Sequence, residues 1–178
     1  MRADKPTITN VGLVRPYKRL ERLVSFARTH RDVNLVIAGS VQNTGYGEEL
    51  EAQAAELDNV ALLLRYVPDS DLKFVMKSSD LFVIPHDTIT NSGSALMALT
   101  FGVPVLAPQL SVFDGLRQRF GPELFMTYES PESLEATIVE VLSRSRRIDP
   151  ADVPWGDLEW SSIAARTVQF YETLTTVP

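Results

Sequence analysis

The sequence contains no cysteine and only two histidines, His30 and His86. Without cysteine the chain can form no disulfide, offers no thiolate nucleophile and has no cysteine ligand for a metal ion. Two histidines nearly exclude a multi-histidine metal centre, and no cluster of carboxylates has the pattern of a metal site. We therefore expect no bound metal ion.

Long apolar runs and a surplus of basic residues are also missing. No run approaches the roughly 20 apolar residues that are needed to cross a bilayer, and residues 1–9 lack the apolar segment of a secretory signal. The 17 Lys and Arg are outnumbered by 23 Asp and Glu, which gives a formal net charge of -6 and disfavours nonspecific nucleic-acid binding. We expect a cytoplasmic protein with no membrane span and no nucleic-acid partner.

The 178 residues do contain a regular alternation of apolar strand patterns and helical patterns. The expected strands are residues 7–14, 33–38, 59–64, 81–84, 104–107 and 124–128. The expected helices are residues 18–30, 48–57, 69–78, the run between 92 and 102, 111–120, a segment that begins at 130–131, and 157–174. Near-continuous apolar strands are typical of a sheet that is covered on both faces. We predict a single doubly wound, mostly parallel α/β domain of about six strands at residues 7–178, after a disordered segment at residues 1–6.

One crossover unit, residues 79–108, has the features of an anion site. A strand is followed by a polar loop, and Ser92, Gly93 and Ser94 then begin a helix. The free N–H groups and positive dipole end of a helix N-terminus suit a phosphate, and small side chains let a ligand reach the backbone. The plainer interpretation is an ordinary helix cap with close packing.

A second candidate is the loop after the first strand, which carries Arg15 and Lys18. In open α/β sheets ligands bind at the carboxyl ends of the strands, where this loop is expected to lie. Two cations there suit a diphosphate, although both could be solvated loop charges. Tyr46, which has glycines on both sides, suggests a mobile loop that closes over a ligand.

The order of these motifs is similar to a known family. The segments are GLVRPYK, LVIAG, NVALLLRYVPDSDL, SSDLFVIPH and SGSALMALTFGVPVLAP. Over residues 7–174 the chain resembles the C-terminal half of group 1 (family 4-like) glycosyltransferases of the GT-B architecture. The resemblance implies a Rossmann-like domain that binds a nucleotide-diphosphate sugar as donor substrate, with no cofactor. It also implies a separate N-terminal half for a glycan or lipid-linked acceptor, which we expect to be absent from this chain.

The resemblance also implies roles for particular residues. The donor diphosphate would be bound by Arg15, Lys18, Ser92, Gly93 and Ser94. The base and ribose would be bound near Gly39, Ser40, Arg65, Tyr66, Val67 and Asn91. Sugar contacts would come from His86, Asp87 and Thr90. Leu13 stands where many members have arginine, so Arg15 would take that role.

The sequence departs from the family at two positions. Many members have two glutamates eight residues apart, where this chain has Ile89 and Met97. An apolar side chain cannot accept a hydrogen bond from a ribose hydroxyl, so Asp87, Thr90 or Asn91 would have to substitute from the same loop.

The chemistry that the resemblance implies is departure of a nucleoside diphosphate during glycosyl transfer. Arg15, Lys18 and the amides of residues 92–94 would stabilise the growing negative charge without a metal. We expect the chain alone to be inactive or nearly so and to bind donor weakly. The full-length protein would act in polysaccharide or glycoconjugate synthesis, in the cytoplasm or at the inner face of the membrane.

Two alternatives remain open from the sequence. One is a binding module of the same fold that has lost catalysis, which the absence of both glutamates would explain. The other is a different α/β class, such as a nicotinamide-dependent enzyme or a receiver domain. It is disfavoured because the first strand leads into neither a G-x-G-x-x-G turn nor an acidic cluster.

Overall fold

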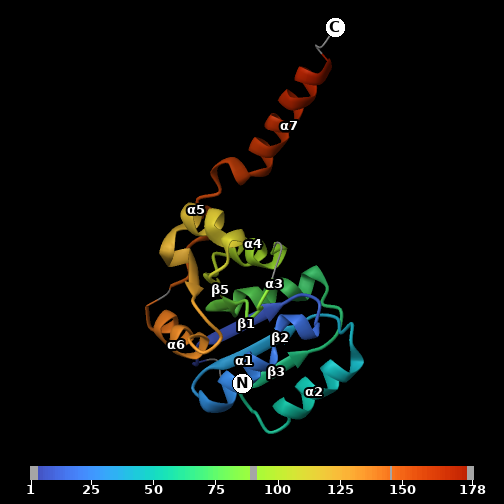
Figure 1. Cartoon of the computed structure of the whole chain (residues 1–178), viewed down its shortest axis with the longest axis vertical. Coiled ribbons are helices and arrows are strands. Elements are labelled where there is room, and N and C mark those ends of the chain that lie inside the picture. The colour runs from blue at the N-terminus through green and yellow to red at the C-terminus, as the bar shows by residue number, and fades with distance from the viewer. Residues whose placement is uncertain (1–3, 89–91, 145, 176–178) are drawn as a thin grey trace.

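A computed structural model describes residues 4–88, 92–144 and 146–175. These residues form a parallel six-stranded sheet in the order β3-β2-β1-β4-β5-β6 (Figure 1). The strands are β1 (Thr7–Val11), β2 (Asn34–Ala38), β3 (Val60–Leu63), β4 (Leu81–Val83), β5 (Val105–Pro108) and β6 (Phe125–Tyr128). The prediction of a Rossmann-like, doubly wound sheet is confirmed.

The helices follow the strands in alternation. The α-helices are α1 (Glu21–Thr29), α2 (Thr44–Ala54), α3 (Asp69–Lys77), α4 (Gly93–Thr100), α5 (Asp114–Leu124), α6 (Leu134–Arg144) and α7 (Trp160–Thr175). The short 3₁₀ turns are η1 (Pro16–Lys18), η2 (Ser111–Phe113), η3 (Pro150–Asp152) and η4 (Gly156–Leu158). Gly121 adopts a positive φ inside α5 and kinks it, close to the end that the sequence predicts.

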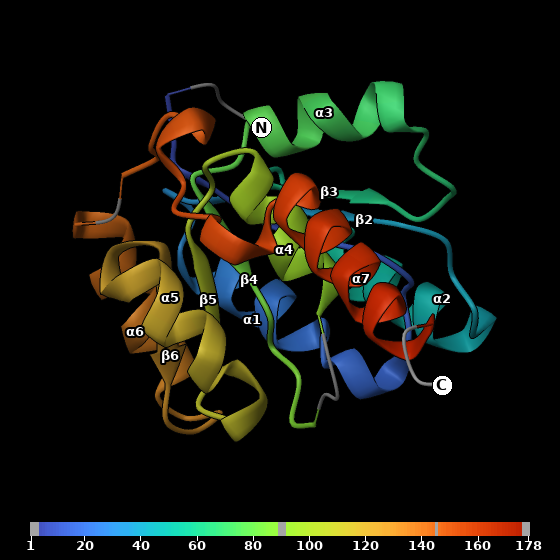
Figure 2. The same ribbon diagram turned by 90° about the horizontal axis from the view of Figure 1, so that it is seen from above.

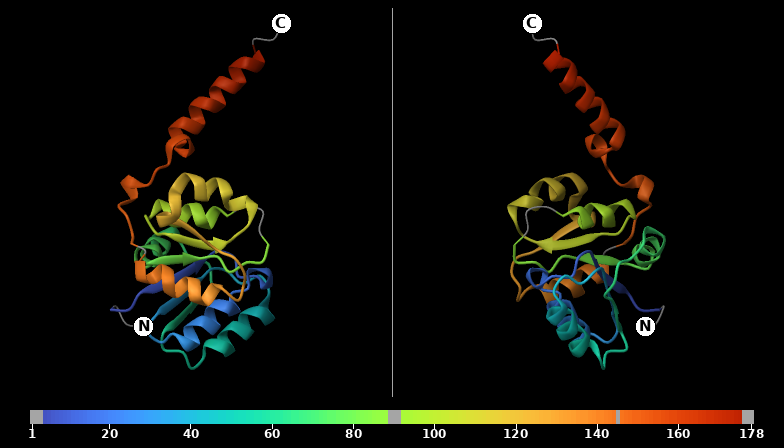
Figure 3. Two further views of the ribbon diagram at one scale, coloured as in Figure 1. Left: turned by 60° about the vertical axis from the view of Figure 1, so that its left-hand side comes forward. Right: turned by 90° about the vertical axis from the view of Figure 1, so that its right-hand side faces the viewer.

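Two apolar clusters cover the two faces of the sheet. Side chains alternate between the faces along each strand, so in β4 Leu81 and Val83 enter one cluster and Phe82 enters the other. The first cluster packs against α1, α2 and α6, and the second packs against α3, α4 and α5. Figure 3 shows α4 and α5 on one side of the strands, with α1, α2 and α6 on the opposite side.

The order in which the chain adds strands to the sheet reverses between β1 and β4. The chain adds β2 and β3 on one side of β1 and then returns to place β4 on the other, with Ile8 of β1 in register with both Leu35 and Leu81. Figure 2 shows the strands spreading from β6 to β3 across this point. In such sheets ligands bind outside the carboxyl ends of the strands where the order reverses. The loops after β1 and β4 therefore form the candidate ligand site.

The segment around Tyr46 corrects one expectation. The helix α2 begins at Thr44, and Tyr46 is buried in its first turn. The Tyr46 hydroxyl accepts a hydrogen bond from the Leu20 backbone N–H (2.8 Å) and donates one to Glu21 (2.6 Å). This side chain fastens α2 to α1, so the prediction of a mobile closing loop is wrong.

The last helix, α7, extends away from the rest of the domain (Figures 1 and 3). Its apolar side chains are exposed, and Trp160 reaches 86% exposure and Phe170 60%. The apolar pattern of these residues in the sequence favours core positions or docking anchors. The exposure shows that they are not core, and docking anchors stay a prediction. None of the helices in the described part of the chain is long and apolar enough to span a membrane.

The N-terminal residues are described only in part. Residues 1–3 of the segment expected to be disordered lie outside the described residues. The Pro6 carbonyl accepts a hydrogen bond from the Asn34 N–H (2.8 Å), and Lys5 donates to the Arg31 carbonyl.

Candidate functional site

Lys18 ends the 3₁₀ turn η1, directly beyond the carboxyl end of β1. Its side chain is buried, with 7% exposure. A β-carbon added at Gly12 would lie 2.9 Å from the Lys18 Nζ atom, so the ammonium group rests against the bare Gly12 Cα. Within the described residues, no carboxylate forms an ion pair with Lys18. Burial and the nearby Arg15 charge lower the Lys18 pKa to about 8, so at neutral pH this is a buried cation with no carboxylate partner in the described part of the chain.

Arg15 lies three residues before Lys18 and adds a second positive charge. Its Nε atom donates a hydrogen bond to the Gln42 side-chain oxygen (2.6 Å). The charge of Arg15 acts directly on Lys18. The structure therefore brings together the two cations that the sequence assigned to a diphosphate, and their mutual repulsion favours binding of an anion.

His86 lies in the loop after β4, the strand that pairs with β1. Its side chain is also buried, with 4% exposure, and neither ring nitrogen has a hydrogen-bond partner among the described residues. Its ring meets the edge of the Tyr17 ring, with centroids 5.7 Å apart. Burial, and next the positive charge of Lys18, lower the His86 pKa to about 4, so the imidazole is neutral at pH 7.

Asp87 is engaged by two arginines from the neighbouring turn and helix. Arg19 Nε donates to one carboxylate oxygen (2.9 Å) and Arg22 Nη1 donates to the other (2.6 Å). Arg22 Nη1 also donates to the Pro85 carbonyl (2.9 Å). The hydrogen bonds from Arg22 and Arg19 hold the pKa of Asp87 below its ordinary value. The predicted role of Asp87 as a sugar contact stays a prediction, and the contacts show that it fixes the loop after β4.

The N-terminus of α4 begins at the residues that the sequence singled out. The Ser92 hydroxyl caps the helix by accepting a hydrogen bond from the Ala95 N–H (3.2 Å), and it lies 3.4 Å from the Ser94 hydroxyl. A β-carbon on Gly93 would meet nothing within 4 Å, so the space beside its backbone is open. Ile89, Thr90 and Asn91 lie outside the described residues.

The residues assigned to the base and ribose lie beyond β2 and β3. A β-carbon on Gly39 would lie 2.1 Å from the Gly12 carbonyl oxygen, so Gly39 serves the close approach of two strand ends. The Ser40 carbonyl accepts from the Val14 N–H (2.9 Å). Arg65 donates to the Tyr66 carbonyl (3.1 Å), and Tyr66 is 72% exposed.

Val67, the last residue of that set, packs with Leu63 against the second apolar cluster. The contacts of these residues are therefore structural or local, and their role toward a base stays a prediction.

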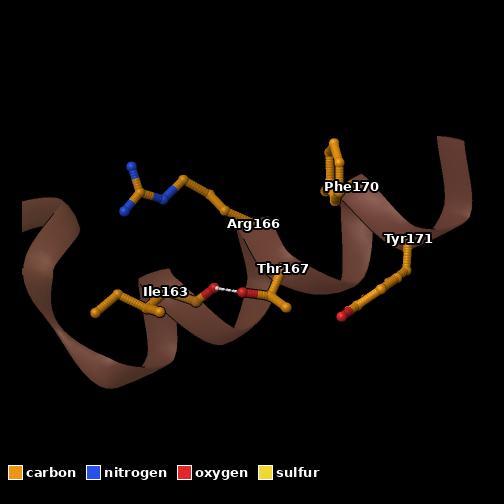
Figure 4. A pocket seen from close by; sticks show the side chains of 5 residues that line it. All are labelled: Ile163, Arg166, Thr167, Phe170 and Tyr171. Carbon is orange, nitrogen blue, oxygen red and sulfur yellow. Dashed lines mark hydrogen bonds between the residues drawn. The ribbon is translucent and has the colours of Figure 1, made fainter. Parts of the chain in front are cut away.

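Two hollows are lined by residues of the last helix, α7. A cavity of about 760 Å³ is bordered by Leu96 and Met97 of α4 and by Trp160 and Ile163 of α7. Met97, one of the two positions without the expected glutamate, thus faces an apolar cavity. Figure 4 shows the second hollow, along α7 itself, where the Ile163 carbonyl accepts a hydrogen bond from Thr167 (2.8 Å).

Three residues near Lys18 and Asp87 were not identified from the sequence as part of the site. Gly12 gives space to the Lys18 ammonium, and Arg19 and Arg22 hold Asp87. The signal for Gly12 was a glycine within the expected strand 7–14, where a missing side chain often marks a close backbone approach. The arginines gave no comparable signal, because Asp87 lies 68 and 65 residues away from them in the chain. In the described ranges, no group of three or more His, Asp or Glu could hold a metal ion.

The fold is that of a Rossmann-like α/β domain. Its basic residues Arg15 and Lys18 lie beyond the carboxyl end of β1, where the strand order reverses. The family model for glycosyl transferases group 1 matches residues 1–150. The chain belongs to the glycosyl transferases group 1 family.

Relatives and solved structures agree with this assignment. The chain is 31% identical over 124 residues to a GDP-mannose:glycolipid 4-beta-D-mannosyltransferase of Xanthomonas campestris pv. campestris, covering 68% of this chain and 36% of that protein. Sucrose-phosphate synthase from Thermosynechococcus elongatus superposes with a TM-score of 0.79 at 20% identity, over 98% of this chain and 47% of that chain.

A third similar structure is the C-terminal domain of a glycosyl transferase group 1 family protein from Francisella tularensis. It has a TM-score of 0.64 at 16% identity, over 84% of this chain and 82% of that domain. The resemblance to the GT-B glycosyltransferases is thus confirmed. The chain spans about a third of the length of the curated relatives that it matches.

Proposed function

We propose that the chain binds the nucleotide-diphosphate sugar donor of a glycosyltransferase that acts on a glycan or glycoconjugate. The observation that supports this best is the buried Lys18 ammonium, which has Arg15 beside it and no carboxylate partner in the described part of the chain. Burying an unpaired charge is costly. A bound diphosphate would supply the missing negative charge at the strand end where such sheets bind ligands.

Each group in the proposed site has a distinct task. Lys18 and Arg15 neutralise the diphosphate, which becomes the leaving group when the glycosidic bond to the sugar breaks. The open backbone at Gly93 and the positive end of α4 add a second source of positive potential. These groups are fixed before the reaction, so they stabilise the charge on the leaving group without reorganising. We propose that no metal cofactor is needed, because the protein cations perform this task.

The identity of the donor is suggested by the Xanthomonas relative. That protein's name gives GDP-mannose as donor and a glycolipid as acceptor. A guanosine diphosphate sugar is therefore the first donor to test, and a lipid-linked glycan is the first acceptor. Because the chain matches only part of its relatives, we propose that transfer requires an acceptor-binding half and that this chain alone is nearly inactive.

A non-catalytic binding module is the second candidate. It is favoured by Met97, which turns an apolar side chain to a cavity at a position where many family members have a glutamate. The two candidates differ in turnover and agree on nucleotide binding. Hydrolysis or transfer of a donor sugar by a protein that contains both halves would distinguish them.

The experiment that tests donor binding is calorimetric titration with GDP and with UDP. We expect one of them to bind and Lys18→Ala to weaken that binding at least about tenfold, because a charge-assisted contact in a buried site is lost. Lys73→Ala is the matched control, since Lys73 is exposed on α3 over the Phe74 ring. Failure of both nucleotides to bind at millimolar concentration, or equal binding by Lys18→Ala, would overturn the proposal.

A further inference from the structure

His86 is a buried polar side chain with no hydrogen-bond partner in the part of the chain that the structure describes. Both of its ring nitrogens are inaccessible and without a hydrogen bond among the described residues. Leaving a buried donor or acceptor unpaired costs about 1–3 kcal/mol. Lys18, the residue after the Tyr17 whose ring contacts His86, is buried as well and has no carboxylate partner among the described residues. An unpartnered imidazole and a buried cation whose charge acts on it indicate a site that is completed by a ligand.

Two charged groups and one aromatic ring act on the His86 side chain. The charge of Lys18, at the end of η1, acts on the ring. Tyr17 contacts the ring through its edge. Asp87, the next residue in the chain, is the one acidic group among the described residues whose charge is felt at His86, and it is held by Arg19 and Arg22.

The Tyr128 hydroxyl of β6 donates its proton to the Ile84 carbonyl (3.1 Å), and it forms no hydrogen bond with the imidazole. Among the described residues, no group of the protein therefore satisfies both Lys18 and His86, and an anion between them would satisfy both.

We propose that His86 is a second phosphate ligand beside Lys18, and that binding of a diphosphate between them places a proton from solvent on the imidazole. This rests on the proposed donor binding and adds a residue and a proton to it. One ring nitrogen gains the proton, and the resulting N–H donates to a phosphate oxygen. The net change is one proton bound per diphosphate.

The electrostatics give the direction of this effect. In the free protein, burial and Lys18 keep the His86 pKa low, at about 4. A diphosphate adds two or more negative charges on the side of Lys18, which cancels that repulsion and favours the charged imidazole. At pH 6 Lys18 is already protonated, because its pKa is about 8. Proton uptake by the protein at pH 6 therefore reports on His86.

The first test uses the unaltered chain and its two histidines. Their C2–H proton resonances are followed against pH, in the free protein and with saturating GDP or inorganic pyrophosphate. We expect the proton affinity of one histidine to rise about a hundredfold to a thousandfold on binding, which is within the effect of a nearby opposite charge and is needed for the imidazole to hold most of a proton at pH 6. His86→Gln assigns this resonance. His30→Gln assigns the other, which belongs to a ring stacked on Phe26 with centroids 4.2 Å apart.

The second test measures protons directly. Titrations of GDP at pH 6 in buffers of different ionisation enthalpy give the number of protons taken up. We expect wild type and His30→Gln to take up more than His86→Gln, by up to one proton, because protonation of the nucleotide itself is common to all three. Gln keeps a hydrogen-bond donor without a titratable group.

The outcomes separate this inference from the proposed function. A raised His86 proton affinity, with reduced uptake in His86→Gln, supports both. Binding of GDP with an unchanged His86 titration overturns the inference and leaves donor binding intact. Binding of pyrophosphate, but of neither GDP nor UDP, with a raised His86 proton affinity supports the anion site and overturns the nucleotide donor. Failure of all three anions to bind overturns both.

Discussion

Gly39 and Gly12 touch at the carboxyl ends of β2 and β1. A β-carbon on Gly39 would lie 2.1 Å from the Gly12 carbonyl oxygen, and Gly39 has a φ of +148°. The Gly12 N–H donates to the Ala38 carbonyl (2.9 Å), and Gly12 in turn leaves space for the Lys18 ammonium. One close approach of two strand ends thus helps set the position of the buried cation.

Replacing Gly39 by alanine should damage the fold. The added methyl would meet backbone atoms, which cannot move aside cheaply, and we predict a loss of about 2–4 kcal/mol in the free energy of unfolding. Gly93→Ala is the matched control, because its β-carbon meets nothing within 4 Å. It should leave stability unchanged or raise it by up to about 1 kcal/mol. Urea denaturation of both variants measures this, and equal stability for the two would contradict the close packing.

Lys18 should be unfavourable for stability although it favours binding. Its pKa falls from 10.5 to about 8 because burial disfavours the charged form. We predict that Lys18→Met raises the free energy of unfolding at pH 7 by about 1–3 kcal/mol and abolishes GDP binding. The gain should shrink between pH 8 and pH 10.5, because the unfolded wild-type chain then binds more protons than the folded one and wild-type stability rises with pH.

Lys73→Met is the control for this trade-off. Lys73 is exposed, so the same substitution should change stability by less than about 0.5 kcal/mol. If Lys18→Met destabilises the chain, the ammonium has a partner in the folded protein and the anion site as described is wrong.

His86 should make the folded chain sensitive to mild acid. Its pKa is lowered from 6.5 to about 4, so between these values the unfolded state binds a proton that the folded state does not. Its contribution therefore lowers stability as pH falls from 6.5 to 4. We predict that His86→Gln becomes more stable than wild type across this window, by about 1–3 kcal/mol at pH 4, relative to any difference at pH 7.

The comparison at each pH removes the effect of the acidic residues, which both proteins share. Urea denaturation at several pH values gives the two curves. Parallel curves from pH 7 to pH 4 would show that His86 is already solvated or paired in the folded chain.

Asp87 should act on binding through Arg22. The two form an ion pair (2.6 Å) in which both side chains are partly exposed, so the pair should contribute less than about 1 kcal/mol to stability. It fixes the loop that carries His86, and we predict that Asp87→Asn and Arg22→Gln each weaken GDP binding. In a double-mutant cycle the double variant should lose no more than either single variant. Additive losses would instead favour a separate contact of Asp87 with the donor, as the sequence suggested.

Much of the fold could be predicted because its signals are local. Apolar runs such as Leu35–Ala38 have the length of buried strands, and each is followed by a helical pattern. This alternation was enough to predict about six strands in a mostly parallel sheet. The start of α2 was missed because Thr44 to Gly47 contains two glycines and resembles a loop. Asn43 caps the helix there by accepting a hydrogen bond from the Tyr46 N–H (3.0 Å).

The site was predictable only in part, because much of it depends on contacts distant in sequence. Arg15 and Lys18 could be placed together from a single loop. The burial of Lys18 could not be predicted, since it depends on Gly12 and on the neighbouring strand. The clamp on Asp87 was missed for the same reason. The exposure of α7 was missed because an apolar pattern indicates that a helix has a packing face and does not indicate what covers it.

The last helix should contribute little to the stability of the chain. Phe170 and Leu174 are 60% and 56% exposed, so serine at both positions removes few contacts. We predict that the double variant changes the free energy of unfolding by less than about 0.5 kcal/mol. By contrast, Ile138→Ala, which truncates a fully buried side chain of α6, should lose about 2–5 kcal/mol.

Urea denaturation followed by circular dichroism measures all three proteins. A large loss for the α7 double variant would mean that this helix packs against protein in solution. Gel filtration would then identify the surface that covers it: a dimer indicates a second copy of the chain, and a monomer indicates that α7 folds back onto its own domain. An unchanged stability would show that no other part of this chain covers the apolar side of α7, which is then free to contact another molecule.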